Sequence, residues 1–165
     1  MRAGRKTLRI LVLSGPNLQL LGTREPAIYG LDTLDDIHQR VALRAAKLGA
    51  EVTCHQSNHE GVLLDLIGGA GGLYEGMLLN GGAYTHTSIA LHDALKAVSV
   101  PCVEVHLSNP EAREEFRRES RLAPACVAKV TGFGADSYVL ALEGIVRLLH
   151  GRRVGSAKTP SHRIP

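Results

Sequence analysis

The sequence predicts an α/β fold in which a five-stranded parallel sheet is covered by helices on both faces. Short apolar runs that are typical of buried strands alternate five times with segments whose apolar residues recur at helical spacing. The 165 residues are enough for one domain with a substantial core, and no internal repeat is apparent.

The first strand is expected at residues 10–13, where four apolar residues follow one another as in a strand buried on both faces. A long polar loop follows it and ends near Gly30. A helix is then expected at residues 34–48. Thr33 is its cap, with Asp36 at the capping-box position and Gly49 as the stop signal.

The remaining elements continue the alternation. We expect strands at 51–55, 76–80, 102–106 and 127–131, and helices at 58–67, at 87–97, from Asn109-Pro110 onward and at 137–149. This order is that of a three-layer, doubly wound, flavodoxin-like fold. A single domain is expected over residues 1–150, and a disordered polar and basic tail over 151–165.

The net charge of +3 arises from the two ends of the chain. Eight of the 19 basic residues lie before residue 10 or after residue 151, and residues 10–151 carry 11 basic against 16 acidic side chains. A nucleic-acid face would need basic side chains clustered within the fold. We therefore expect no nucleic-acid partner.

The chain also lacks the signals of membranes, export and disulfides. No apolar stretch is long enough to span a bilayer, and the basic N-terminus shows no signal-peptide cleavage pattern. Cys54, Cys102 and Cys126 show no metal-type spacing and lie in apolar contexts, so we expect reduced, buried thiols. A cytoplasmic protein without a membrane partner is expected.

Polar residues follow four of the predicted strands, where parallel sheets bind their ligands. They are Asn17, Arg24 and Tyr29 after the first strand, residues 56–60 after the second, Asn80 to His86 after the third, and His106, Ser108 and Asn109 after the fourth. Polar loops are common, so this placement supports a site without identifying its reaction.

Two residue pairs carry specific chemistry. An arginine close to a phenol lowers the pKa of the phenol, so Arg24 and Tyr29 could provide a tyrosinate base. Glu104 and His106 lie two apart on a strand and share a face, where a carboxylate fixes the tautomer of an imidazole and favours its acidic form. The alternatives are a solvated loop and a solvent-facing sheet rim.

An anion site is expected after the fourth strand. Backbone N–H groups at residues 107–109 would be free at the start of a helix and favour a substrate carboxylate. Arg113 and Arg117, four apart on that helix, would share a face, although most charges around them are expected to be solvated.

Several other functions lack their sequence signatures. The chain has no phosphate-binding loop, no dinucleotide fingerprint after the first strand and no nucleophile elbow. His59 and His86 could each contribute to a metal site, but no tight cluster of His, Asp or Glu supports one. We expect neither a metal nor a cofactor.

Five motifs in order resemble type II 3-dehydroquinate dehydratase. They are SGPNL with LGTREP and Tyr29-Gly30, QSNHEG at 56–61, NGGAYTHTS at 80–88, EVHLSN at 104–109 and AREEFR at 112–117. The likeness extends from Leu8 to about Leu149. It departs from the family pattern at Ser14 and Gln19, where Asn is usual, and at Gly81, where Pro is usual.

The resemblance implies a hydro-lyase that converts 3-dehydroquinate reversibly into 3-dehydroshikimate through an enolate, without metal or Schiff base. The family serves the shikimate pathway, and so chorismate and aromatic amino acid biosynthesis, while quinate catabolism is the alternative role. Implied catalytic residues are Tyr29 as the base, Arg24 as its activator, His106 as the acid, Glu104 to orient it and Asn17 to hold a water.

The resemblance also implies the substrate contacts and the assembly. Substrate would be bound by Asn80, His86, Arg117 and the backbone at Leu107 and Ser108, and Asp93 would reach the site of a neighbouring subunit in a dodecamer of four trimers. Two rival functions remain open: a binding module of the same fold, which would bind without turnover, and a metal-dependent hydrolase, which chelators would inhibit.

Overall fold

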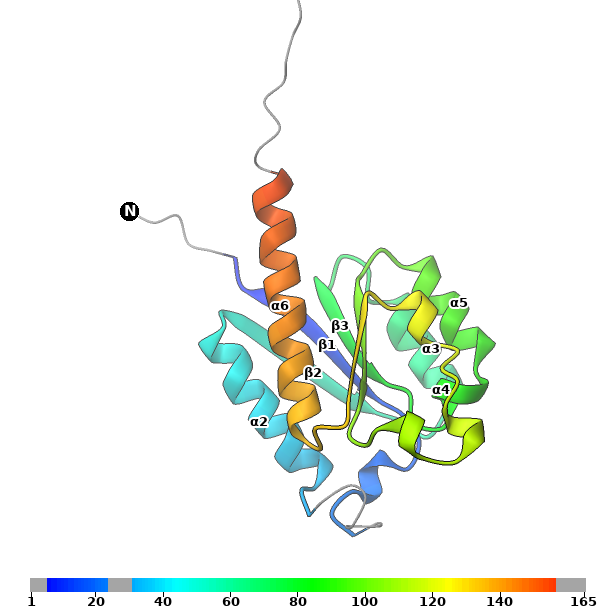
Figure 1. Cartoon of the computed structure of the whole chain (residues 1–165). Helices are drawn as coiled ribbons and strands as arrows, with labels where there is room; N and C mark the ends of the chain where they lie inside the picture. Colours follow the sequence, from blue (N-terminus) through cyan, green and yellow to red (C-terminus); the bar gives the residue numbers. More distant parts are fainter. Residues whose placement is uncertain (1–5, 24–30, 157–165) are drawn as a thin grey trace, which may run out of the picture.

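Five parallel strands form one sheet in the order β2-β1-β3-β4-β5 (Figure 1). The computed structural model describes residues 6–23 and 31–156. The strands are β1 (Leu8–Ser14), β2 (Ala50–Gln56), β3 (Gly76–Asn80), β4 (Cys102–His106) and β5 (Ala128–Thr131). The predicted flavodoxin-like strand order is confirmed.

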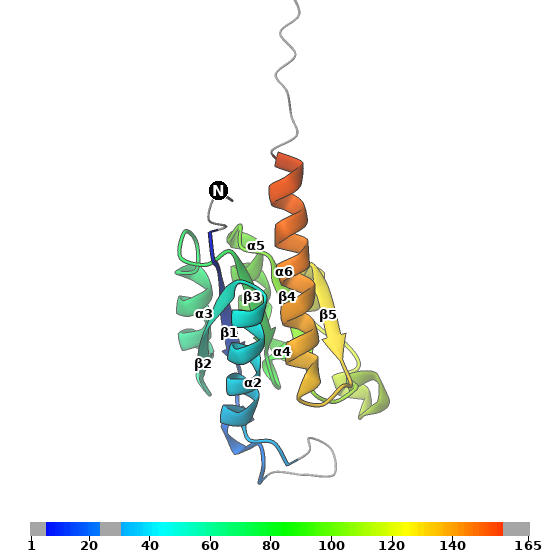
Figure 2. The ribbon, with the colours of Figure 1, turned by 90° about the vertical axis from the view of Figure 1, so that its left-hand side faces the viewer.

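Helices cover both faces of the sheet, as Figure 2 shows from the side. On one face lie α2 (Leu34–Lys47) and α6 (Asp136–Ser156), and on the other lie α3 (Glu60–Gly68) and α5 (Ile89–Ala97). One further helical turn, α4 (Tyr84–Thr87), precedes α5. The three-layer architecture is therefore the predicted one.

The central strand β1 explains why both faces need cover. Its side chains alternate between the two layers, so that Ile10 and Val12 pack under α2 and α6 while Leu11 and Leu13 pack under α3 and α5. All four are at most 1% exposed. A continuous apolar run is what a strand buried on both faces requires.

The helix starts depend on local capping. The Thr33 hydroxyl accepts a hydrogen bond from the backbone N–H of Asp36, and the Asp36 side chain accepts one from the backbone N–H of Thr33, so the predicted capping box is present. A hydrogen bond from the Thr33 hydroxyl to the Asp36 carboxylate at 2.6 Å, and then the one from the Thr33 N–H, lower the pKa of the Asp36 carboxyl. At α5 the cap is Ser88, whose hydroxyl accepts from the N–H of Leu91.

The prediction of a helix after Asn109 is wrong. Asn109 caps only the 3-10 turn η2 (Pro110–Ala112), and a second turn, η3 (Glu115–Arg117), follows an extended Arg113. Residues 111–119 offer few apolar side chains, and Phe116 among them is 67% exposed. Without an apolar stripe to bury, a helix here has no packing to sustain it.

Several other boundaries differ from the prediction, and two of them concern the ends of helices. The segment before Ser88 forms α4, and the extended backbone of Ser88 separates it from α5, so Thr87 is not the cap of the longer helix. At the other end of the chain α6 continues to Ser156 instead of ending at Leu149. The division into a domain at 1–150 and a disordered tail at 151–165 stays a prediction.

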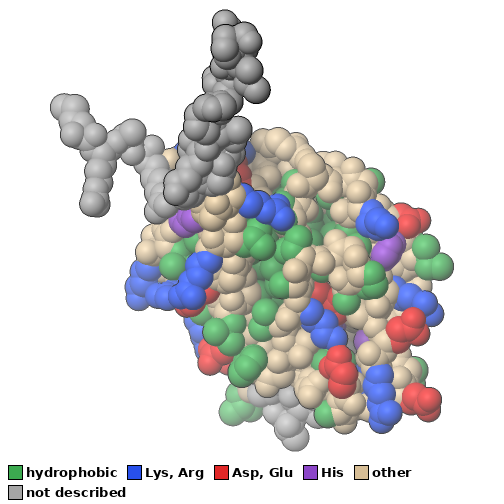
Figure 3. All heavy atoms as spheres, turned by 45° about the horizontal axis from the view of Figure 1, so that its top comes forward, with side chains coloured by type: hydrophobic (Ala, Val, Ile, Leu, Met, Phe, Trp, Pro, Cys, Tyr) green, Lys and Arg blue, Asp and Glu red, His purple; other side chains and the backbone are tan. Residues whose placement is uncertain are grey.

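Charged side chains of both signs and free thiols are present in the described part of the protein. Over the described part of the face in Figure 3, Lys and Arg side chains lie interspersed with Asp and Glu. Cys54, Cys102 and Cys126 are free thiols; Cys102 is buried as predicted, whereas Cys54 and Cys126 are only half-buried, so the prediction of burial is wrong for these two. A hydrogen bond with Cys126, together with burial, raises the pKa of Cys102. No helix within the described ranges is long and apolar enough to cross a membrane.

Candidate active site

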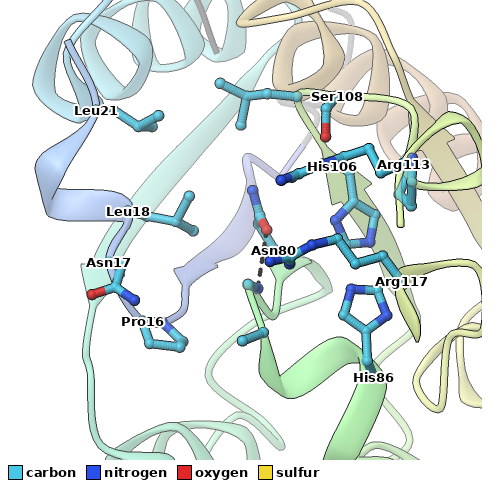
Figure 4. Close-up of a pocket in the computed structure, with 14 residues that line it drawn as sticks. Pro16, Asn17, Leu18, Leu21, Asn80, His86, His106, Ser108, Arg113 and Arg117 are labelled. Atoms are coloured by element: carbon cyan, nitrogen blue, oxygen red, sulfur yellow. Dashed lines mark hydrogen bonds between the residues drawn. The ribbon is translucent and has the colours of Figure 1, made fainter. Parts of the chain in front are cut away.

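A cavity of about 180 Å³ opens at the carboxyl ends of β1, β3 and β4 (Figure 4). Its lining comes from the loop after β1, from residues around α4 and from the segment that follows β4. Ligands of doubly wound sheets bind at this edge. The cavity therefore lies where the sequence places the polar residues.

The loop after β1 forms one wall and is held close to the loop after β3. The N–H of Gly15 donates to the carbonyl of Asn80 at 2.8 Å, and a Cβ atom at position 15 would lie 2.5 Å from the carbonyl oxygen of Gly81. Only glycine fits this approach. The contact fixes where the loop enters the cavity.

Asn17 stands at the turn of this loop in a left-handed conformation, with φ of 66°. Its N–H donates to the side-chain oxygen of Asn58 at 3.0 Å. The turn continues into η1 (Leu18–Leu20), so that Leu18 and Leu21 form an apolar part of the wall. Figure 4 shows Asn17 and Leu18 on the side of the cavity that faces Asn80.

The floor is built around Asn80 at the end of β3. Its side chain is 3% exposed, and its oxygen accepts from the N–H of Gly82 at 3.2 Å. Behind it lies the fully buried Tyr138 of α6, whose hydroxyl lies 3.1 Å from that of Ser14. Burial raises the pKa of Tyr138 to about 12, against the opposing effect of hydrogen bonds with Ser14 and Asn80.

Glu104 and His106 form a buried pair at the end of β4. The Nε2 atom of His106 donates to Oε1 of Glu104 at 2.7 Å, and the two residues are 8% and 0% exposed. The shared face predicted from their spacing on a strand is thus present. Because the Glu104 carboxylate accepts at Nε2, Nδ1 is the ring nitrogen left for a ligand in the cavity.

His86 in α4 lies near His106 in the cavity (Figure 4). Its Nδ1 lies 2.8 Å from the backbone carbonyl of Glu119. A carbonyl oxygen only accepts, so Nδ1 carries the proton and Nε2 is the acceptor. In their neutral forms both histidines therefore present an acceptor nitrogen to a ligand, and His106 can donate from Nδ1 only as an imidazolium.

Two arginines supply positive charge to the cavity. Arg113 and Arg117 both line it, and their Nε atoms lie 3.4 and 3.0 Å from the same Glu114 oxygen. A backbone hydrogen bond first, and then these two guanidinium groups, lower the pKa of the Glu114 carboxyl. The arginines come together through η2 and η3 and not, as predicted, on one helical face.

Leu107 and Ser108 complete the lining where β4 leaves the sheet. The carbonyl of Leu107 accepts from the N–H of Gly134 at 2.9 Å, which ties this turn to the loop before α6. Asn109 follows as the cap of η2. This is a single 3-10 turn, so the predicted helix N-terminus is absent, although Leu107 and Ser108 of the predicted residues do line the cavity.

Two of the predicted catalytic residues, Arg24 and Tyr29, lie outside the described residues. Asp93 lies on α5 and is exposed, and it does not line the cavity of its own chain. Among the residues that the structure describes, no three His, Cys, Asp or Glu side chains could hold a metal ion together.

The structure adds residues that motif reasoning missed. Pro16, Leu18, Leu21 and Pro110 give the cavity an apolar wall. The spacing of Leu18 and Leu21 fits one helical turn, but their contact with the site depends on tertiary packing. Ser120 is a second omission: its hydroxyl lies 2.7 Å from Oε2 of Glu104, and no sequence signal connects two residues that are sixteen apart.

The departures at Ser14 and Gln19 are accommodated by hydrogen bonds. Ser14 contacts Tyr138 as described above, and the Gln19 side-chain oxygen accepts from the Gln56 amide at 3.0 Å. Both positions lie beside the cavity and not among the groups that line it.

The chain is similar in sequence and in fold to 3-dehydroquinate dehydratases. A 3-dehydroquinate dehydratase from Nostoc is 56% identical over 144 residues, which are 87% of this chain and 98% of the relative. One from Marinomonas is 55% identical over 145 residues, covering 85% and 97%. The crystal structure of type II dehydroquinase from Butyrivibrio crossotus has a TM-score of 0.83 at 39% identity, covering 87% and 99%.

The family model for class II dehydroquinase matches residues 8–146, which include every strand of the sheet and all of the described cavity lining. This chain belongs to the class II dehydroquinase family.

Proposed function

We propose that this protein is a type II 3-dehydroquinate dehydratase of the shikimate pathway and that the cavity is its active site. The observation that carries the proposal is the buried Glu104–His106 pair, which faces a cavity containing two guanidinium groups. Dehydration of 3-dehydroquinate needs an acid for a poor leaving group and cationic or polar groups for an anionic substrate.

The reaction follows from the roles proposed for each residue. Tyr29, activated by Arg24, removes the proton next to the ketone, and the electrons of that C–H bond form an enolate. The enolate then expels the hydroxyl group as its electrons form the C=C bond. His106 gives the hydroxyl its proton from Nδ1, so water leaves. A water held by Asn17 stabilises the enolate oxygen.

Substrate recognition uses the remaining groups of the cavity. We assign the substrate carboxylate to the backbone at Leu107 and Ser108, and the ring hydroxyls to Asn80, His86 and Arg117. These groups come from the two connections that follow β3 and β4 and meet around one space. Holding the substrate at several points places the reacting carbon between base and acid.

A direct assay tests this function. Purified protein is mixed with 3-dehydroquinate, and the absorbance of the conjugated enone product is followed with and without a chelator. Turnover unaffected by the chelator is expected. His106→Asn should lower kcat by about 10²–10⁴-fold, whereas the exposed His59, outside the cavity, serves as the matched control in His59→Gln. Lack of turnover by the wild-type protein would reject the proposal.

We propose also that the active unit is an oligomer, a dodecamer of four trimers, in which Asp93 reaches a neighbouring site. Its exposure on α5, away from the cavity of its own chain, supports this role. Co-assembly of Asp93→Asn with His106→Asn chains should restore part of the activity, because some sites then combine an intact His106 with an intact Asp93. Light scattering gives the assembly size. The cytoplasmic location stays a prediction.

A further inference from the structure

We propose that Ser120 is a positioning residue for the dehydration, which holds the Glu104 carboxylate in place and thereby presents Nδ1 of His106 to the substrate. The inference rests on the proposed function for its kinetic consequence only. Its structural basis is a chain of hydrogen bonds that runs from Ser120 through Glu104 to His106.

The direction of the bond from Ser120 is set by its other partners. The N–H groups of Leu122 and Ala123 donate to the Ser120 hydroxyl oxygen at 3.1 and 2.9 Å. A serine hydroxyl has two acceptor positions and one proton. Since both acceptor positions are used, the proton is directed to Oε2 of Glu104, at 2.7 Å.

Glu104 therefore receives one hydrogen bond at each oxygen. Oε1 accepts from His106 and Oε2 accepts from Ser120, and the side chain is completely buried. The two bonds match the acceptor-only carboxylate form and leave its plane no freedom to rotate. A carboxylate held in this way has one fixed oxygen against the imidazole.

The consequence for His106 is a single tautomer. With Nε2–H bound to Glu104, the proton that reaches the substrate is carried by Nδ1 in the imidazolium. When that proton passes to the departing hydroxyl group, the neutral imidazole keeps its Nε2 proton. No rearrangement of the ring or of Glu104 is then required during the step.

The segment that carries Ser120 is itself anchored to α4. The N–H of Arg121 donates to the carbonyl of Thr85 at 2.8 Å, and the carbonyl of Glu119 accepts from Nδ1 of His86 at 2.8 Å. Two successive residues, Glu119 and Ser120, thus orient both histidines of the cavity. Neither residue lines the cavity, so the segment acts on the reaction only through the two histidines that it orients.

A double-mutant cycle tests the proposal. Ser120→Ala should lower kcat about tenfold, which is typical of groups within one hydrogen-bond network, and change KM much less. In the Glu104→Gln background, Ser120→Ala should cause no further loss of kcat, because Ser120 acts through Glu104. Equal losses in both backgrounds would overturn the proposal, since a purely structural role predicts them.

Two variants control the cycle. Ser120→Thr keeps the hydroxyl group and should retain most of the kcat that Ser120→Ala loses; equal losses in the two variants would overturn the proposal. Ser57→Ala removes a serine that also binds a backbone N–H, that of His59 at 2.9 Å, without touching Glu104 or His106. It should leave kcat unchanged, and a loss matching that of Ser120→Ala would overturn the proposal.

A measurement that needs no turnover separates this inference from the proposed function. Nitrogen-15 NMR of the wild-type protein should show neutral His106 protonated at Nε2, and the Ser120→Ala variant should show a mixture of tautomers. If Ser120→Ala does not fold, the wild-type spectrum still decides: a His106 protonated at Nδ1 alone in its neutral form refutes the positioning. Inactivity toward 3-dehydroquinate would refute the proposed function, whereas the spectrum would still test the positioning of His106 independently.

Discussion

The hydroxyl of Tyr138 lies 3.1 Å from the hydroxyl of Ser14, beneath the floor of the cavity. Both residues are fully buried, one on α6 and the other at the end of β1. The phenol also contacts Asn80, which lines the cavity. A buried polar group therefore links the helix layer to a residue that lines the cavity, and it makes the stability of the fold depend on pH.

Replacing this phenol should destabilise the protein at neutral pH. Tyr138→Phe removes the partner of two buried polar side chains, Ser14 and Asn80, and leaving such groups unsatisfied costs about 1–3 kcal/mol. Urea unfolding at pH 8 measures the difference in the free energy of unfolding. An unchanged midpoint would contradict the contribution assigned to this hydrogen-bonded group.

The deficit should shrink in alkali. The pKa of Tyr138 is raised to about 12 from 10.0, so between these values the unfolded chain loses a proton that the folded chain keeps. Between these values the wild-type protein therefore loses about 1.4 kcal/mol of stability per pH unit from this group. Below pH 10 the contribution of the group to stability is fully present. Tyr138→Phe lacks this loss.

Unfolding curves at pH 8 and at pH 11 test the sign of this effect. Cys54, whose pKa burial raises to about 11, contributes a loss of the same sign, but it is present in both proteins and cancels in the comparison. A constant difference in stability between wild type and Tyr138→Phe over this range would show that Tyr138 ionises normally in the fold.

Arg117 is expected to affect substrate binding more than its neighbour in sequence. Arg117 lines the cavity, while Arg118 is exposed and does not. Arg117→Ala should raise KM about tenfold or more, since a hydrogen bond to a charged group contributes about 1.5–3 kcal/mol. Arg118→Ala is the matched control and should leave KM unchanged. Equal effects of the two substitutions would argue against specific recognition.

Arg24 lies outside the described residues, but its proposed role has a distinct kinetic signature. Without this cation the pKa of the Tyr29 phenol rises, so the limb of the pH–rate profile that reports deprotonation of the base moves to higher pH. Arg24→Ala should also lower kcat by about 10²–10⁴-fold near neutral pH. Arg24→Lys, which keeps the charge, should move the limb less. A limb that stays in place would reject the role.

The sequence predicts those features of the structure that depend on residues close together along the chain. The capping box at Thr33 and Asp36, the buried run of β1 and the shared face of Glu104 and His106 each follow from neighbouring residues, and each is present in the structure. Local periodicity of this kind also yields the flavodoxin-like fold class, because alternating strands and helices permit few topologies.

The errors arise where tertiary contacts decide. Asn109 and Pro110 favour a helix start, yet the charged segment after them has too little apolar surface to keep one, and two 3-10 turns bring Arg113 and Arg117 to the cavity instead. The role inferred for Ser120 depends likewise on its contact with Glu104 across sixteen residues. Sequence patterns carry no record of such a contact.

Replacing glycine by alanine should change the stability of the protein in opposite directions at Gly81 and at Gly144. At Gly81, directly after Asn80, an added Cβ atom would lie 2.7 Å from both the Leu122 Cδ1 and the Thr85 Oγ1 atoms. Both neighbours are fully buried, so neither can move freely, and overpacking of this kind costs about 1–3 kcal/mol. Gly81→Ala should therefore lower the melting temperature.

Gly144 is the matched control. It lies inside α6, it is exposed, and nothing lies within 4 Å of an added Cβ atom. Gly144→Ala should raise the free energy of unfolding by about 0.5–1 kcal/mol, because alanine loses less conformational entropy in a helix. Thermal unfolding of both variants beside wild type makes the comparison. If both substitutions stabilise the protein, the loop at Gly81 yields to a side chain, and the close packing between this loop and Leu122 does not constrain the floor of the cavity.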